Sequence, residues 1–253
     1  MTRLIVLASP ELCAAALRRP TPSSPEDAVR VIGEGATAMT LDVVCTPWDQ
    51  EAEVAGVRGM LDPDRASDSE SLDWSAAVAG WLVATPDRRP VVGVVSGPLW
   101  LAATVRREDP ELDPQDALDE ASDFVAGRVR RLCQLGVAEV VVLERAGESV
   151  SDPSAAAEAH TAIARLGHHF GVSVILVALE DALPAGDLGY EHWVSPNRSA
   201  GDLVLVSAAS LRDGTTRSLD GAAGAVTEYL HADVPPEAVR EVVGAVTRSG
   251  QGS

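Results

Sequence analysis

The chain has 253 residues, in which 38 acidic residues outnumber 20 basic ones and give a formal net charge of −18 at pH 7. Every basic residue is Arg, and the absence of Lys excludes Schiff-base and pyridoxal-phosphate enzymes, which need an amine, and phosphate loops ending in Gly-Lys-Ser/Thr. The acidic balance also argues against a nucleic-acid partner, because affinity for the phosphate backbone comes from clustered basic side chains.

Length and apolar content fit one domain over 1–253, with a frayed tail over 246–253. No apolar run is long enough to cross a membrane, and the first apolar run is too short for a signal peptide. The three cysteines are scattered without CxxC spacing, which is typical of a reducing compartment. These features predict a cytoplasmic protein without a membrane partner.

Short apolar runs alternate with helical periods along the whole chain. The runs are almost continuous in Val, Ile and Leu, as in parallel strands that are buried on both faces. Strands are expected at 3–8, 39–44, 91–96, 139–143, 173–179 and 203–207, with weaker candidates at 57–61 and 192–195. Helices are expected at 10–18, 25–34, 49–55, 72–84, 114–134, 154–170, 218–230 and 236–248. Loops are expected at 62–71, 147–153 and 184–201.

The clearest helix is the one expected at 114–134. Asp113 is a suitable N-cap, Pro114 suits the first turn, and Gly136 suits the end. Apolar residues recur in it at spacings of three and four, which predicts one buried stripe.

The alternation of strand and helix predicts an α/β fold with right-handed crossovers. Seven or eight strand candidates favour a single closed (β/α)8 barrel of the TIM type over an open sheet. In such a barrel the chemistry lies beyond the carboxyl ends of the strands.

Polar and charged residues stand near several of the expected strand ends. They include Asp42, Ser96, Gly97, Glu144 and Arg145. Clustered carboxylates can serve as an acid, a base or metal ligands, although each could also simply cap the next helix. Trp100 could stack on a flat ligand or pack in the core, and Arg145 and Arg212 could meet an anionic substrate or form surface ion pairs.

The order of several segments resembles the uroporphyrinogen decarboxylase family. The segment from Val92 to Trp100 is similar to that family's strand ending in Gly-(x)-Pro, and the strand from Val140 to Glu144 is similar to one that ends in a carboxylate. Leu41-Asp42 with the later Pro47 and Glu51-Ala52 resembles another family segment, and the stretch from His231 to Val239 resembles the family's final loop and helix.

The resemblance implies a TIM barrel whose N-terminal part is shortened, because the family's Arg-rich substrate loop is not found here. It implies catalytic roles for Asp42, Glu144 and His231, with Asp42 matching the aspartate that holds pyrrole N–H groups. Ser96, Gly97, Trp100, Arg145 and Arg212 are expected to bind substrate.

The main functional expectation is a cofactor-free carboxy-lyase acting on a small carboxylated or pyrrole-like substrate. One alternative is a methyltransferase similar to the corrinoid-dependent enzymes or to methionine synthase. The zinc-ligand position of those enzymes reads Val177-Ala178-Leu179 here, so no metal is expected. The other alternative is a ligand-binding protein without catalysis. The expected partner is a small molecule, and the sequence is compatible with a homodimer.

Overall fold

The structure is a computed structural model that describes residues 3–61, 70–85, 89–145, 152–180, 188–196, 199–200, 203–214 and 224–249. The expected loops at 62–71 and 147–153 lie largely outside the described residues. The expected loop at 184–201 is described over 188–196 and 199–200, where it contains the short strands at His192–Val194 and Ser199–Ala200. The tail was expected to fray from 246, but the last helix continues to Ser249, and 250–253 lie outside the described part.

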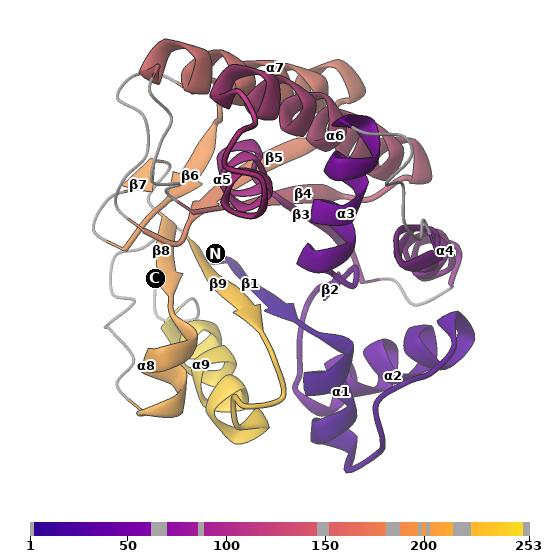
Figure 1. The fold of residues 1–253 in the computed structure, drawn as a ribbon. Coiled ribbons are helices and arrows are strands. Elements are labelled where there is room, and N and C mark those ends of the chain that lie inside the picture. Colours follow the sequence, from indigo (N-terminus) through magenta and orange to yellow (C-terminus); the bar gives the residue numbers. More distant parts are fainter. Residues whose placement is uncertain are drawn as a thin grey trace.

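The strands and helices alternate along the chain (Figure 1). The strands are β1 Arg3–Ala8, β2 Val44–Cys45, β3 Val91–Ser96, β4 Glu139–Glu144, β5 Ser173–Ala178, β6 His192–Val194, β7 Ser199–Ala200, β8 Leu203–Val206 and β9 Gly224–Leu230. The helices are α1 Pro10–Leu17, α2 Pro25–Ala38, α3 Gln50–Leu61, α4 Glu70–Ala84, α5 Pro98–Glu108, α6 Pro114–Leu135, α7 Pro153–Phe170, α8 Ala208–Arg212 and α9 Pro236–Ser249.

The strands form two sheets, ordered β2-β3-β4-β5-β6-β7 and β1-β9-β8. Every pairing is parallel except that of β6 with β7. The α/β prediction is therefore confirmed. β1 lies beside β2, and β6 lies beside β8, but the ladders of the described residues do not continue across these two seams into a closed barrel.

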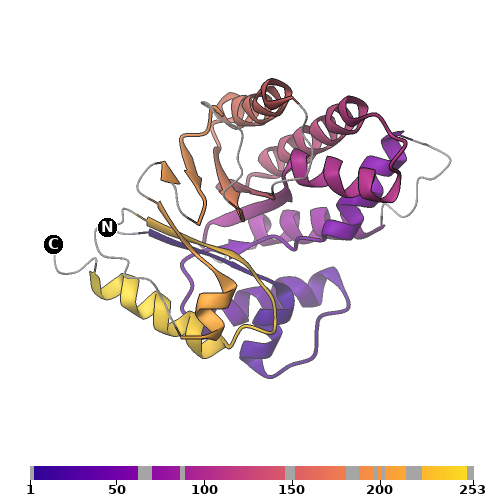
Figure 2. The same cartoon turned by 60° about the vertical axis from the view of Figure 1, so that its left-hand side comes forward.

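The core has two layers because successive strand residues point to opposite faces. Strand residues such as Leu7, Val94 and Leu143 belong to an inner cluster enclosed by the two sheets. Their chain neighbours Val6 and Val95 belong to the outer cluster beneath the helices. Figure 2 shows the two sheets meeting at an angle, with helices on their outer sides.

The helix expected at 114–134 is confirmed as α6. Asp113 Oδ1 accepts from the backbone N–H groups of Gln115 and Asp116, at 2.8 and 3.3 Å. Gly136 ends the helix with φ 90°, a conformation that glycine adopts without steric cost. The same device ends α7, where Gly171 has φ 67°.

Three expected elements are wrong or displaced. The expected strand at 57–61 is the last part of α3, which buries Val54 and Val57 on one face. The expected helix at 218–230 is wrong for 224–230, which form β9 between β1 and β8. The expected strand at 39–44 begins only at Val44, because α2 ends at Ala38 and Thr40 then turns the chain with φ 58°, outside the strand region.

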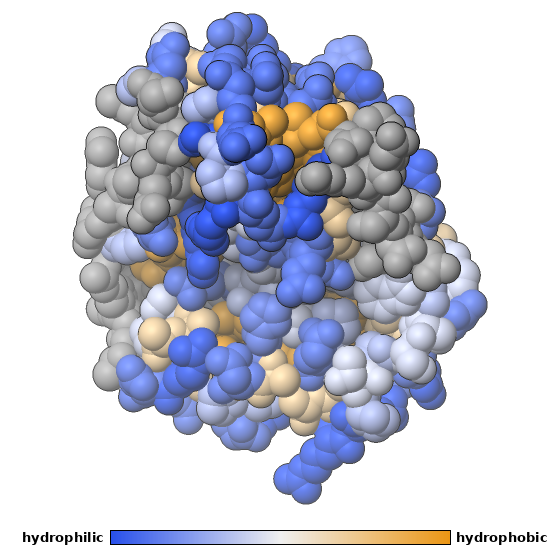
Figure 3. Space-filling view, in the orientation of Figure 1, coloured by the Kyte–Doolittle hydropathy of each residue, from blue (hydrophilic) through white to orange (hydrophobic). Residues whose placement is uncertain are grey.

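The visible surface is predominantly polar. Figure 3 shows a mostly hydrophilic face with one strongly apolar area near the top of the view. Met60 and Trp81 are the large apolar side chains that are exposed in the described part of the chain. Within that part, no helix combines the length and the apolar character needed to cross a membrane.

Candidate functional site at the carboxyl ends of the strands

A cavity of about 380 Å³ opens beyond the carboxyl ends of β1, β2 and β9, and we call it the mouth cavity. Its volume falls within the roughly 300–1,000 Å³ of typical small-molecule sites. It is lined by Pro10, Glu11, Pro47, Trp48, Asp49, Gln50, Glu51, Trp74, Ser75, Tyr229 and His231. Active sites of parallel α/β proteins lie at this end of the strands, so the mouth cavity is the candidate site.

A row of aromatic rings runs from the mouth cavity toward β4. His231 packs against Tyr229 at 5.2 Å between ring centroids, and Tyr229 packs against Trp48 at 5.1 Å. Trp48 is 5.3 Å from Trp100, and the guanidinium carbon of Arg145 lies 4.8 Å from the Trp100 ring centroid. These edge-on and tilted contacts are the preferred geometries of aromatic pairs, so each ring is held in place by its neighbours beside the mouth cavity.

Trp48 and β3 are tied together by a buried carboxylate. Glu53, in α3, is 2% exposed, and its Oε2 accepts from the Ser96 backbone N–H at 2.9 Å and from Trp48 Nε1 at 3.2 Å. The indole N–H also donates to Ser96 Oγ at 3.0 Å. Arg128 supplies the nearest positive charge, with Nε 3.8 Å from Glu53 Oε1. These contacts fix the Trp48 ring beside the mouth cavity.

Burial raises the pKa of Glu53 above its ordinary value, although Arg128 and the hydrogen bonds from Ser96 and Trp48 act in the opposite direction. Burial likewise raises the pKa of Tyr229 well above its usual value, and the nearby charge of Glu11 contributes in the same direction. Tyr229 is therefore a neutral phenol at physiological pH. Its hydroxyl accepts from the Trp48 backbone N–H at 3.0 Å.

Glu144, at the end of β4, is fully buried and anchors the start of α5. Its Oε1 accepts from the backbone N–H of Trp100 at 2.8 Å and of Arg145 at 2.9 Å, and its Oε2 accepts from Leu99 N–H at 3.1 Å. A carboxylate is favourable here because the first turn of a helix has unpaired N–H groups. Gly97 makes the approach feasible, since a Cβ at this position would lie 2.2 Å from Glu144 Oε2.

Behind Glu144 lie two further buried polar side chains. His160 Nε2, in α7, is 3.2 Å from Glu144 Oε2, but the two atoms are not aligned for a hydrogen bond. The two side chains are therefore in close contact without a hydrogen bond between these atoms. His160 Nδ1 is 3.1 Å from the Tyr190 hydroxyl. Burial, and then the charge of Glu144, raise the pKa of Tyr190 well above its usual value.

The structure brings most of the predicted site residues to one end of the sheets. Ser96, Gly97 and Trp100 stand at the junction of β3 and α5, with Arg145 exposed just beyond β4. His231 lines the mouth cavity directly. The catalytic and substrate-binding roles assigned to these residues, and that of the buried Glu144, stay predictions.

Two predicted residues lie elsewhere. The expectation that Asp42 stands at the mouth is wrong, because β2 begins at Val44, which pairs with Val91, the first residue of β3. Asp42 is thus exposed beside the amino ends of the strands. Arg212, at the end of α8, forms a surface ion pair with Asp233, with 2.9 Å between Nε and Oδ2, and does not line the mouth cavity.

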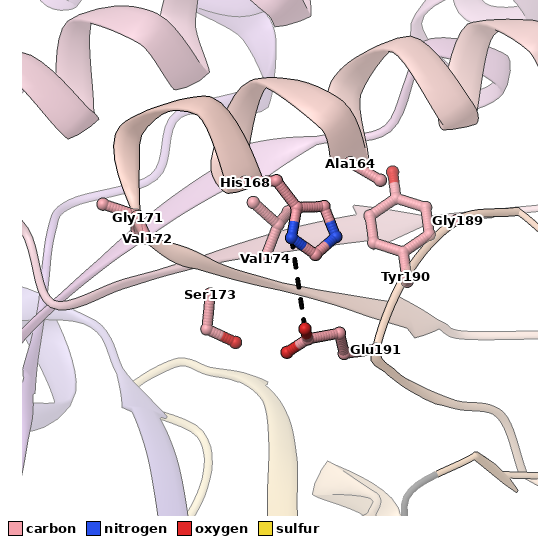
Figure 4. A pocket seen from close by; sticks show the side chains of 9 residues that line it. All are labelled: Ala164, His168, Gly171, Val172, Ser173, Val174, Gly189, Tyr190 and Glu191. Atoms are coloured by element: carbon pink, nitrogen blue, oxygen red, sulfur yellow. Dashed lines mark ion pairs between the residues drawn. The ribbon is translucent and has the colours of Figure 1, made fainter.

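A second cavity, of about 310 Å³, lies at the opposite end (Figure 4). It is bounded by the end of α7, the start of β5 and the segment before β6. The His168 imidazole points toward Glu191, with 4.0 Å between Nδ1 and Oε1, and both side chains are more than half exposed. An exposed ion pair contributes little, and the amino ends of the strands serve mainly stability in such folds, so we place the site at the mouth cavity.

The described side chains do not reproduce the zinc site expected of the methyltransferases named above. Ala178, the last residue of β5, is buried and offers no donor atom where those enzymes have ligands. Cys45 donates its thiol to the Ala8 carbonyl, and burial raises its pKa far above the usual value. Among the described residues no three His, Cys, Asp or Glu side chains group as metal ligands, so this part of the chain does not fit a zinc ion.

Two residues of the site, Glu53 and Tyr229, are not among those predicted from the sequence. Glu53 lies one turn from Val57, on the buried face of α3, and an acidic residue on an apolar helix face is the signal that identifies it. Tyr229 falls in the segment that was expected to be helical, so its position near the end of a strand was not foreseen.

The comparisons with known proteins concern the fold. Neither a family model nor a curated protein matches this chain. Among solved structures, the fold is similar to that of a methyltransferase from Methanosarcina mazei, with a TM-score of 0.69 and 13% sequence identity. The match covers 98% of this chain and 94% of that chain, so the similarity extends over nearly the whole of both, and none of these comparisons supports a carboxy-lyase.

Proposed function

We propose that the chain is a methyltransferase that acts on a small molecule bound in the mouth cavity. The observation that carries the proposal is the structural similarity to a methyltransferase over nearly the full length of both chains. On the same basis we propose membership of the uroporphyrinogen decarboxylase-like superfamily and a TIM-type barrel whose seams are closed by side-chain packing.

The lining of the mouth cavity suits methyl transfer better than decarboxylation. In methyl transfer the donor atom keeps the electron pair of its bond to the methyl group, and the acceptor, for example a thiol, forms the new bond and releases its proton. An imidazole can take that proton, and His231 lines the cavity. A carboxy-lyase would instead rely on the aspartate matched by Asp42, which lies at the other end of the strands.

The test supplies methylcobalamin or 5-methyltetrahydrofolate as the methyl donor and 2-mercaptoethanol as the acceptor. Mass spectrometry then measures the thioether that forms when the thiol is methylated. We expect the protein to accelerate formation of the S-methyl product with at least one donor. His231→Gln should lower the rate by about 100-fold, the lower end of typical general-base contributions. Glu111→Gln, an exposed substitution outside the mouth cavity, is the control for purification and handling. No acceleration with either donor would overturn the proposal.

A second candidate, a ligand-binding protein without catalysis, is favoured by one observation. The two buried carboxylates near the mouth, Glu53 and Glu144, direct their oxygens at backbone and indole N–H groups, and neither lines the cavity. Ligand binding to the wild-type protein without methyl transfer would support this candidate.

A further inference from the structure

We infer that the mouth cavity binds an organic cation of the alkylammonium class. The inference rests on the proposed function only in using the same cavity, and it names the kind of molecule that this lining selects.

The first argument is the chemistry of the rings. Trp48, Trp74 and Tyr229 all line the cavity. The faces of electron-rich rings attract cations, and sets of such rings are the known means of recognising quaternary ammonium groups. Trp48 and Tyr229 are held rigidly by the contacts described above, so these two rings need no reordering when a ligand enters.

The second argument is the charge of the lining. Three carboxylate residues, Glu11, Asp49 and Glu51, border the cavity, and no Arg is among the described residues that line it. Within the described part of the chain, Glu11 and Glu51 have no ion-pair partner. The cavity also lies in a protein of net charge −18, and a cleft lined by one sign of charge concentrates ligands of the opposite sign.

The size of the cavity narrows the ligand further. A volume of about 380 Å³ is the size of a small-molecule site and is too small for a polymer. An anionic tetrapyrrole, by contrast, would meet carboxylates where it needs cations. The rings and the carboxylates together therefore select a compact cation over a neutral molecule of the same shape.

The experiment compares choline with 3,3-dimethylbutan-1-ol, its uncharged isostere, by isothermal titration calorimetry on the intact protein at low ionic strength. We expect choline to bind at least about tenfold more tightly than the alcohol. Raising the NaCl concentration to about 0.5 M should weaken choline binding severalfold, because screening reduces attraction between charges. Equal binding of the two molecules, or no choline binding at tens of millimolar, would overturn the inference.

Two matched variants locate the binding site. Glu11 and Glu26 both follow the proline that begins a helix, in α1 and α2, but only Glu11 lines the mouth cavity. Glu11→Gln should weaken choline binding about fivefold, whereas Glu26→Gln should leave it unchanged. Similar effects of the two substitutions would assign the attraction to net charge alone and contradict the inference.

The outcome is separable from that of the proposed function. Binding of choline without any methyl transfer supports the inference and argues against the methyltransferase. If the protein transfers methyl groups but choline neither binds to it nor inhibits the reaction, the methyltransferase is supported and the inference is overturned.

Discussion

At the scale of single residues, two buried carboxylates organise the mouth in different ways. Glu144 accepts from three backbone N–H groups and so fixes the start of α5. Glu53 accepts from one backbone N–H group and one indole, with Arg128 at a longer distance, and so fixes Trp48. Both therefore hold neighbouring groups in place: Glu144 the first turn of α5, and Glu53 the indole that borders the mouth cavity.

Glu53 gives a prediction about pH. Because burial raises its pKa above the ordinary value of 4.5, folding favours the protonated acid. Its contribution to stability is therefore full below pH 4.5 and is lost as the pH rises through the folded-state pKa. Glu53→Gln cannot ionise, so the free energy of unfolding of the variant, minus that of the wild type, should increase between pH 4.5 and 8. Urea unfolding across this range measures the difference, and a constant difference would refute the argument.

At the scale of elements, the junction of β3 and α5 depends on a glycine. Gly97→Ala would place a Cβ 2.2 Å from Glu144 Oε2, and the side chain cannot move away without leaving the backbone N–H groups of α5 unpaired. We expect a loss of about 2–3 kcal/mol in the free energy of unfolding, the cost of unpairing a buried charged group.

Gly127→Ala is the matched control for this prediction. A Cβ at Gly127, inside α6, would meet no atom within 4 Å, so alanine should stabilise the helix by about 0.5–1 kcal/mol. Urea denaturation of both variants checks the pair. Destabilisation of similar size in both would mean that the contact with Glu144 does not matter.

Sequence patterns predicted the elements best where local signals agreed with the environment. Asp113 and Gly136 mark both ends of α6, and the Val-rich runs of β3 and β4 are buried on both faces as their composition predicts. β9 was mistaken for a helix because the segment 218–230 contains three Ala residues, which favour helices. Its strand conformation comes from tertiary pairing with β1 and β8, which no local window contains.

The candidate site could be predicted only in part for the same reason. The Ser96–Gly97 turn follows an expected strand, and the rule that sites lie at carboxyl ends is enough to find it. His231 was expected only from the family resemblance, because the strand before it was taken for a helix. Asp42 was misplaced because an apolar run does not reveal where pairing starts, and β2 pairs only from Val44 onward. The roles of Glu53 and Tyr229 depend on contacts between distant segments of the chain.

At the scale of the whole molecule, the net charge of −18 sets how stability depends on salt. Like charges that are crowded on a folded surface repel one another, and added salt screens that repulsion. We expect Tm to rise between about 20 mM and 500 mM KCl, as measured by differential scanning calorimetry. A Tm that falls over this range would show that ion pairs such as Arg212–Asp233 outweigh the net repulsion.

The position of β1 has a consequence for biosynthesis. β1 forms its ladder with β9, which follows more than 200 residues later, and it reaches β2 through side-chain contacts such as the Cys45 thiol on the Ala8 carbonyl. During translation, the apolar β1 segment therefore has no hydrogen-bonded partner strand until β9 has left the ribosome. The six-stranded sheet can assemble before that moment, whereas the three-stranded sheet is necessarily among the last parts to form.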